Sequence, residues 1–144
     1  MFSKTCKYGI RAVLYLAVNS GEDEKLGLEQ IAENLSVPKP FLAKLLQQLT
    51  KNRLISSTKG RNGGYYLSDS NKSSNLMRVI ESFDGKETFT QCVIGLKDCS
   101  NSNPCPYHNE VQKYRNSFFR KLREETIEES AIRIKKHDYT IQNN

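Results

Sequence analysis

Three cysteines and one histidine lie close together in the second half of the chain, at a spacing that could hold a metal. They are Cys92, Cys99, Cys105 and His108, in the pattern C-x6-C-x5-C-x2-H. Thiolates are soft ligands that favour iron–sulfur clusters, zinc or copper(I), and an imidazole can complete their coordination. The pattern therefore predicts a metal centre. For His108 the alternative role is that of a polar first residue in the helix that follows.

The spacing of the cysteines bears on the kind of metal. Structural zinc sites commonly use cysteine pairs separated by two residues, and this segment contains no such pair. The segment also contains Gly95, Pro104 and Pro106, so its backbone can wrap around a larger centre. An iron–sulfur cluster is therefore favoured over zinc, which stays as the alternative. Incidental thiols are the third interpretation, but such cysteines usually lie among apolar residues, and these have polar neighbours.

The remaining cysteine and histidine predict no site. Cys6 shares a helical face with Ile10, Val13 and Ala17, which indicates a core residue. His137 lies in a charged C-terminal segment, so we expect it at the surface.

The size and charge of the chain limit the classes of protein to which it can belong. Its 144 residues suit one small domain with an appendage, which excludes barrels and doubly wound nucleotide-binding enzymes. The 22 lysines and arginines outnumber the 16 acidic residues and give a net charge of +6. Such a charge favours a polyanionic partner, most often nucleic acid, with a solvated basic surface as the alternative. No nucleophile–base pair, phosphate-binding loop or carboxylate dyad is present, so we predict no enzyme activity.

The sequence also predicts a compartment. No apolar stretch is long enough to span a membrane, and the first residues do not follow the pattern of a secretory signal. We therefore expect a cytoplasmic protein without a membrane partner, in which the cysteines are reduced thiols rather than disulfides.

The first half of the chain has the pattern of three helices. Apolar residues recur at helical spacing in segments 10–17, 28–35 and 41–49. A tight turn separates the second segment from the third, and Pro38 suits the first turn of the third helix.

A hairpin follows the three helices. Segments 54–58 and 65–67 have the composition of short strands, and the turn between them is rich in glycine. Residues 68–75 have the composition of a loop. The order helix, short helix, turn, helix, hairpin predicts a mainly α fold with a winged helix–turn–helix domain over residues 1–83.

Polar and basic side chains on this domain are the candidates for contacts with double-stranded DNA. A helix can enter the major groove with its polar face while its apolar face stays on the core, and a basic wing can contact phosphates. The expected groove contacts are Lys39, Pro40, Ala43, Lys44 and Gln47, and the expected wing contacts are Lys59, Arg61 and Asn62. The alternative is an exposed amphipathic helix and a solvated turn without a ligand.

The C-terminal part of the chain predicts a long helix over about 107–125. It carries an apolar stripe that a second copy of the chain could cover, so we expect a homodimer and a palindromic operator. Thr126 and Glu129 form the pattern of a capping box, which predicts a break and a short last helix. The predicted regions after the winged domain are a cysteine-rich loop (84–108), the dimerisation and terminal helices (107–135) and a fraying tail (136–144).

Four stretches together resemble the bacterial Rrf2 family of winged-helix regulators. They are MFSKTCKYGIRAVLYLA, IA-x2-L-x5-FLAKLLQQL, LISSTKGRNGGYYLS and the cysteine triplet before a long helix. The resemblance covers about residues 1–135. The G-x-x-GGY wing and the triplet are specific in combination, although each is weak alone.

The resemblance implies a homodimeric, cytoplasmic transcription regulator, with repression as its expected action. It implies that Cys92, Cys99 and Cys105 hold a 2Fe–2S or 4Fe–4S cluster, of which we favour 2Fe–2S. His108 occupies the place of the fourth ligand in one branch of the family. The cluster would control operator affinity in response to iron, redox state or nitric oxide. The alternatives are the same fold with structural zinc or a thiol switch, and an iron–sulfur electron-transfer protein that binds no DNA.

Overall fold

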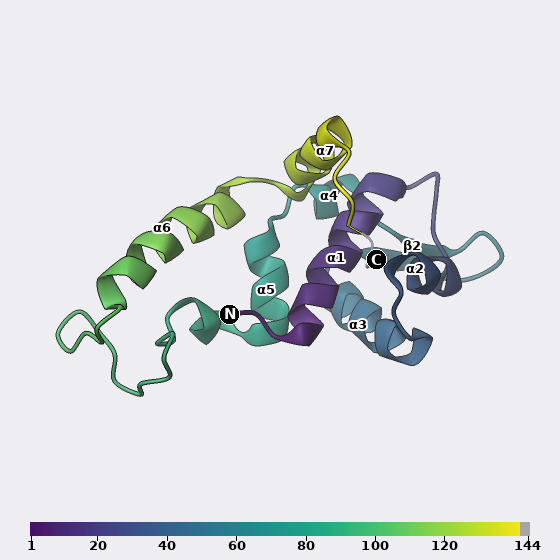
Figure 1. Ribbon diagram of the computed structural model, residues 1–144. Coiled ribbons are helices and arrows are strands. Elements are labelled where there is room, and N and C mark those ends of the chain that lie inside the picture. Colours follow the sequence, from purple (N-terminus) through teal and green to yellow (C-terminus); the bar gives the residue numbers. More distant parts are fainter. Residues whose placement is uncertain (142–144) are drawn as a thin grey trace.

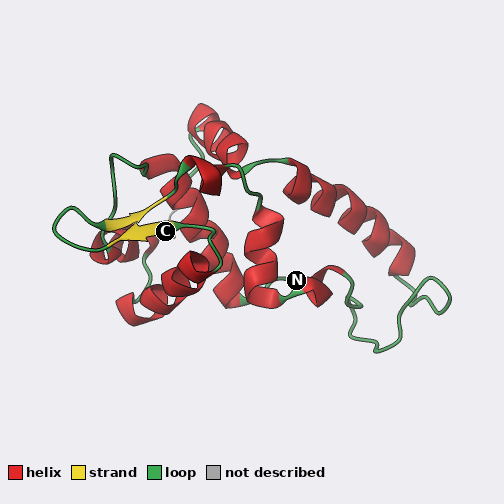
Figure 2. Cartoon of the chain, turned by 180° about the vertical axis from the view of Figure 1, so that it is seen from behind, coloured by secondary structure: helices red, strands yellow, loops and turns green. Residues whose placement is uncertain are grey.

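The computed structural model describes residues 1–141, and in that part of the chain it is mostly helical (Figure 1, Figure 2). The elements in chain order are α1 (Lys4–Asn19), α2 (Leu28–Leu35), α3 (Lys39–Lys51), β1 (Ser56–Thr58), β2 (Gly64–Tyr66), α4 (Asp69–Lys72), α5 (Leu76–Asp84), the 3-10 helix η1 (Lys86–Phe89), α6 (His108–Glu124) and α7 (Ile127–His137). This order confirms the predicted mainly helical, winged helix–turn–helix fold with a long helix near its C-terminus.

Helix α1 lies at the centre of the molecule, where it contacts α2, α3, α5 and α7 (Figure 1). Its residues Ala12, Val13 and Leu16 are fully buried, as the apolar spacing predicts. The Ser3 side chain accepts a hydrogen bond from the Cys6 backbone N–H and caps the N-terminus of the helix. Cys6 itself is fully buried, which confirms it as a core residue.

Helices α2 and α3 form the helix–turn–helix. Ser36 ends α2 in the left-handed conformation at φ 54°, and its backbone N–H donates to the carbonyls of Ala32 and Glu33. Pro38 is the capping residue before α3, so the prediction that it lies in the first turn is wrong by one position. Pro40 lies in that turn instead, where its missing N–H leaves no hydrogen bond unmade.

The wing consists of β1 and β2, which pair antiparallel with Ser56 opposite Tyr66. Leu26 extends this sheet, because its N–H donates to the Tyr65 carbonyl at 2.9 Å and its carbonyl accepts from the Tyr65 N–H at 2.8 Å. Gly64 has φ +149°, and a Cβ there would lie 2.7 Å from the Leu26 carbonyl oxygen. The close approach of the two backbones therefore requires glycine at this position.

Two segments around the hairpin differ from the prediction. Residues 54–55 are buried ahead of β1 and pack in the core instead of pairing in the sheet. Segment 68–75 contains the one-turn helix α4, where a loop was expected. Ser68 and Asn71 form a capping box at this turn, and the buried Asn71 also accepts a hydrogen bond from Ser56 Oγ and donates one to the Arg53 carbonyl. The local cap and the long-range hydrogen bonds together outweigh the loop-like composition of the segment.

Helix α6 leads away from the winged domain, and α7 folds back over α1 (Figure 1). The Thr126 side chain accepts from the Glu129 N–H, and the Glu129 carboxylate accepts from the Thr126 N–H, so the predicted capping box and break are confirmed. Ile127 and Ala131 are buried in the same core as α1. The last helix is therefore part of the winged domain's core.

The residues after α7 do not follow the expectation of a frayed tail. The helix continues to His137, which is exposed as predicted, and Asp138 ends it in the left-handed conformation. Ile141 is partly buried against the core. The predicted tail also includes 142–144, which lie outside the described residues.

The hairpin and the segment between η1 and α6 lie at opposite ends of the molecule (Figure 1, Figure 2). Within residues 1–141, no helix combines the length and the hydropathy that crossing a bilayer requires.

Candidate metal centre and DNA interface

The fold brings the three predicted cysteines together. The Sγ atoms of Cys92, Cys99 and Cys105 all lie within 4.8 Å of one another, and none of the three forms a disulfide. Around one zinc ion, with Zn–S bonds of about 2.3 Å, tetrahedrally arranged thiolates would lie about 3.8 Å apart. The observed separation is therefore that of side chains able to share one metal centre. Soft thiolate ligands fit either an iron–sulfur cluster or zinc.

His108 begins α6 and lies beside the thiols. Its Nδ1 lies 3.3 Å from the Cys99 Sγ, and its Nε2 lies 2.9 Å from Asn101 Oδ1. Asn101 can fix the orientation of the imidazole, as hydrogen-bond partners of metal-ligating histidines do. The ring is thus held next to the cysteines by one contact on each nitrogen.

Hydrogen bonds around the cysteines favour a thiolate at Cys92. Partial burial raises the pKa of this thiol, but hydrogen bonds with the backbone of Leu96 and Ile94 and with the other two thiols together outweigh it and lower the pKa below 9.0. At Cys99 a backbone hydrogen bond with Cys105 lowers the pKa, but partial burial and the neighbouring thiols together raise it above 9.0. The hydrogen bonds around Cys92 therefore favour its thiolate, the form of the side chain that binds metal.

A cleft of about 750 Å³ opens beside the cysteines. Its walls come from η1, the cysteine loop and one face of α6, and Met77 of α5 also contributes. Among the polar residues that line this cleft is Arg115 of α6, which the sequence did not predict as part of the site. Its guanidinium donates to the carbonyl of Gln91, the residue before the first cysteine. A basic residue seven positions beyond His108 carries no local pattern that could have singled it out.

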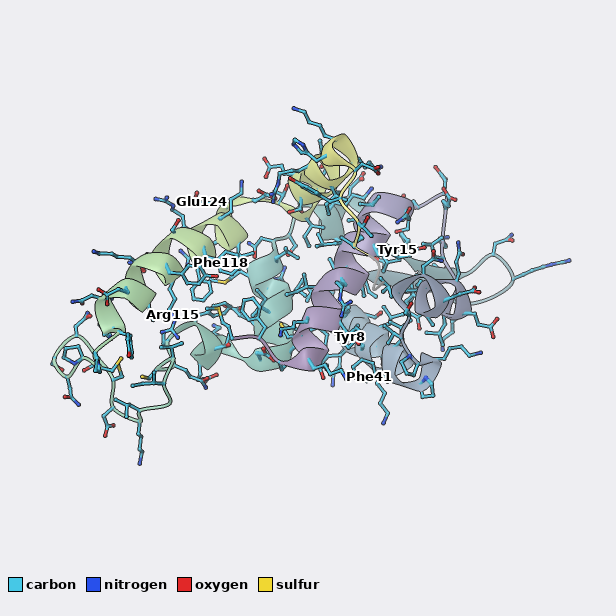
Figure 3. All side chains as sticks on the ribbon, in the orientation of Figure 1. Tyr8, Tyr15, Phe41, Arg115, Phe118 and Glu124 are labelled. Carbon is cyan, nitrogen blue, oxygen red and sulfur yellow. The ribbon has the colours of Figure 1, made fainter. Side chains whose placement is uncertain are left out.

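The predicted groove residues are spread over the outer face of α3. Four of them are exposed and Ala43 is half-buried. Phe41 packs edge-to-face on Tyr8 of α1 at a centroid distance of 5.5 Å, which fixes the apolar face of α3 against the core (Figure 3). The Lys39 ammonium lies 2.6 Å from a Glu29 carboxylate oxygen, so α2 already supplies one partner for its charge. Lys44 and Gln47 are exposed on the same helix.

The predicted wing residues lie at the tip of the hairpin. Lys59, Arg61 and Asn62 are all exposed. The turn that carries them is closed by a hydrogen bond from the Gly63 N–H to the Gly60 carbonyl. The helix and the wing therefore present basic side chains from two separate elements of one domain, as readers of duplex DNA do.

A comparison with known protein families identifies the family of this chain. The model of the Rrf2 family, described as an iron-dependent transcriptional regulator, matches residues 2–131. The chain belongs to the Rrf2 family.

Individual relatives agree with this assignment. An HTH-type transcriptional regulator of Aquifex aeolicus is 29% identical over 98% of both chains. The regulator NsrR of Oceanobacillus iheyensis is 27% identical over 88% of this chain and 86% of its own length. Among solved structures, T. potens IscR superimposes with a TM-score of 0.71 at 21% identity, covering 97% of this chain and 92% of that one.

Membership of the Rrf2 family confirms part of the functional prediction. The protein is a transcription regulator similar to IscR and NsrR, and its relatives are regulators rather than enzymes. The structure adds that a group of cysteines able to bind metal lies at the end of the molecule opposite the wing.

Proposed function

We propose that this Rrf2 regulator is a repressor whose affinity for its operator is controlled by an iron–sulfur cluster. Cys92, Cys99 and Cys105 would hold the cluster and His108 would complete the ligand set. When bound, the cluster would supply sensitivity to iron, redox state or nitric oxide. The single observation that carries the proposal is the convergence of three thiols from one loop within 4.8 Å.

A chain of contacts could link this loop to the DNA-binding helix. Helix α5 leads through η1 into the loop, and Phe89 of η1 packs edge-to-face on Phe119 of α6 at 4.7 Å. At the end of α5, the Ser82 carbonyl accepts a hydrogen bond from the Gln48 side chain of α3 at 2.5 Å. Asn52, which follows α3, donates to Ser82 Oγ at 3.1 Å. Ordering the loop would therefore act on the same helix end that holds α3 in place.

For the DNA contacts, we propose the groove residues Lys39, Pro40, Ala43, Lys44 and Gln47 and the wing residues Lys59, Arg61 and Asn62. Lys44 could read guanine and Gln47 could read adenine in the major groove. Seven of these eight residues are exposed and Ala43 is half-buried, which supports the assignment. The partner would be a palindromic operator in double-stranded DNA.

We propose that the regulator acts as a homodimer through α6. Tyr114 is 54% exposed and stacks on Phe118 at a centroid distance of 5.6 Å. Tyr107 at the start of the helix, and Val93 in the cysteine loop, are large apolar residues that are also exposed. A second copy would bury these side chains and bring two recognition helices to the two half-sites of an operator.

The decisive experiment replaces the three clustered cysteines with alanine. The wild-type protein, purified without oxygen, is expected to contain iron and acid-labile sulfide and to absorb visible light, and the variant is expected to lose all three properties. Operator affinity of the wild type is expected to change about 5- to 150-fold between loaded and metal-free protein, the usual range of coupling between two sites. The affinity of the variant is expected to stay at one value.

Cys6→Ala is the control for the loss of a cysteine, because Cys6 is buried in the core and is not one of the three clustered thiols. It is expected to keep iron, sulfide and regulated DNA binding. A triple variant whose operator occupancy still followed iron supply, oxygen and nitric oxide like the wild type would refute the proposal. Colourless, zinc-loaded wild-type protein would favour the second candidate, a structural zinc site in the same regulator, which the same thiols also fit.

A further inference from the structure

Arg115 contains a buried nitrogen without a hydrogen-bond partner. Among the described residues, its Nε is the one buried side-chain nitrogen or oxygen atom in this state. A buried donor that is left unpaired is destabilising, so in a native structure it calls for an explanation such as a bound ion, a ligand or an ordered water. The cost is larger for a charged guanidinium.

The position of Arg115 links this nitrogen to the cysteines. Arg115 lies on α6, about two helical turns after His108, and lines the same cleft as Cys92, Cys99 and Cys105. Figure 3 shows its side chain between α6 and the segment that follows α5. One terminal nitrogen of the guanidinium donates to the Gln91 carbonyl, next to Cys92. The side chain therefore fixes the end of the loop that carries the first thiol.

The negatively charged sulfurs of the predicted centre could provide the hydrogen-bond acceptor that the buried Arg115 Nε lacks. Three thiolates around zinc or an iron–sulfur cluster carry a net negative charge, and a charge in a partly closed cleft needs a compensating partner. Thiolate and sulfide sulfurs accept hydrogen bonds, and such outer contacts tune both metal affinity and reduction potential.

We propose that Arg115 is a positioning residue for the metal centre, donating its Nε–H to a sulfur of that centre while it anchors Gln91. The inference rests on the proposed function, because it needs a metal held by the cysteines. Arg120 and Arg123 line the same cleft, but neither has an unpaired buried nitrogen. Arg115 is thus the cation of α6 that the structure assigns to the centre.

The test compares Arg115→Gln and Arg115→Lys with Lys113→Gln, a control at an exposed position of α6 outside the cleft. Each full-length protein is reconstituted without oxygen, and the rate of iron or zinc loss to a chelator is measured. Arg115→Gln is expected to lose metal about 10- to 100-fold faster than the wild type, the usual effect of removing an outer-shell partner. Lys113→Gln is expected to match the wild type.

For an iron–sulfur centre, the midpoint reduction potential is a second readout that loss of packing alone would not move in a set direction. Arg115→Gln is expected to lower the potential, because removing a nearby positive charge favours the oxidised centre. Arg115→Lys keeps the charge but not the planar donor, so its potential is expected to lie nearer the wild-type value while its metal loss is faster than wild type.

Two outcomes overturn the inference, and they can be told apart. If the wild type holds metal and both Arg115 variants match Lys113→Gln in metal loss and in potential, the inference fails alone. If the wild type binds neither iron nor zinc, the proposed function fails and the inference fails with it.

Discussion

At the scale of single residues, the side chains are clustered at one end of the molecule and exposed to solvent at the other. The cysteine loop gathers thiols and an imidazole around a small volume, with contacts of 3.3 Å or less on His108. The hairpin tip keeps Arg61 and its neighbours exposed. Gathered thiols suit a compact metal centre, and exposed cations suit the regularly spaced phosphates of DNA.

Replacing Arg61 with alanine is expected to weaken binding to all DNA sequences by a similar factor, because a phosphate contact carries no sequence information. The slope of log K against log salt concentration is expected to fall in magnitude by about 1, since one fewer counterion is released. Fluorescence anisotropy with operator and unrelated DNA, at several salt concentrations, measures both effects.

The control for this substitution is Lys135→Ala, which removes an exposed cation from α7. It is expected to leave the affinity and the salt slope unchanged. An Arg61→Ala protein with an unaltered slope would show that Arg61 does not contact a phosphate.

At the scale of secondary-structure elements, the junction of α6 and α7 sets the direction of the long helix. Glu125 lies between the two helices with only 9% of its side chain exposed. It pairs with Lys121 of α6 at 2.5 Å and with Arg133 of α7 at 2.6 Å, and Ser130 donates to it as well. The Ile127 N–H donates to the Ser74 carbonyl at 2.8 Å and ties the junction to the start of α5.

These partners make the junction sensitive to acid. Burial raises the pKa of the Glu125 carboxyl, but the hydrogen bonds from Lys121, Ser130 and Arg133 outweigh it and lower the pKa to about 2. Because the folded-state pKa lies below the ordinary 4.5, the stabilisation is fully present above about pH 4.5. It is lost as the pH falls from there towards 2.

Glu125→Gln is expected to lower the free energy of unfolding at pH 7 by about 1–2 kcal/mol, a modest value because both basic partners are half exposed to solvent. The difference from the wild type is expected to shrink as the pH falls from 4.5 towards 2. Urea unfolding across this range measures both. Glu128→Gln, at an exposed position of α7, is the control. If the difference in unfolding free energy between Glu125→Gln and the wild type did not depend on pH, the low pKa assigned to Glu125 would be contradicted.

At the scale of the whole molecule, α6 presents two faces with different properties. One face lines the cleft with Arg115, Arg120 and Arg123. The other face carries Tyr114 and Phe118. The ring centroid of Phe118 also lies 6.3 Å from that of Phe2 at the N-terminus. Since the two faces differ, a partner copy on the aromatic face could leave the polar lining of the cleft in place.

Tyr114→Glu is expected to convert the proposed dimer to a monomer at micromolar concentration without loss of the fold. The side chain is mostly exposed in the single chain, so the substitution affects association far more than folding. Sedimentation equilibrium reports the mass, and operator affinity is expected to fall at least about tenfold because the two half-sites are no longer bound together. Lys113→Glu is the control on the neighbouring position, and a dimeric Tyr114→Glu protein would exclude this face as the interface.

The amino-acid sequence by itself determined the helices, the winged order and the cysteine spacing. These signals are local: they are the apolar periodicity in 10–17 and 41–49 and the capping box at Thr126. Because each acts within a few residues, it can be recognised from the sequence alone. Composition, by contrast, misassigned 68–75 as a loop, because the helical turn there is stabilised by a capping box of Ser68 and Asn71 and by hydrogen bonds from Asn71 to residues far away in the chain.

Only the tertiary structure decided which side chains meet. It brought three thiols within 4.8 Å, paired Lys39 with Glu29, folded α7 into the core of the winged domain and left the Arg115 nitrogen unpaired beside the cysteines. Each of these results depends on the relative placement of elements, which is set by the packing of the whole core and has no local pattern in the chain.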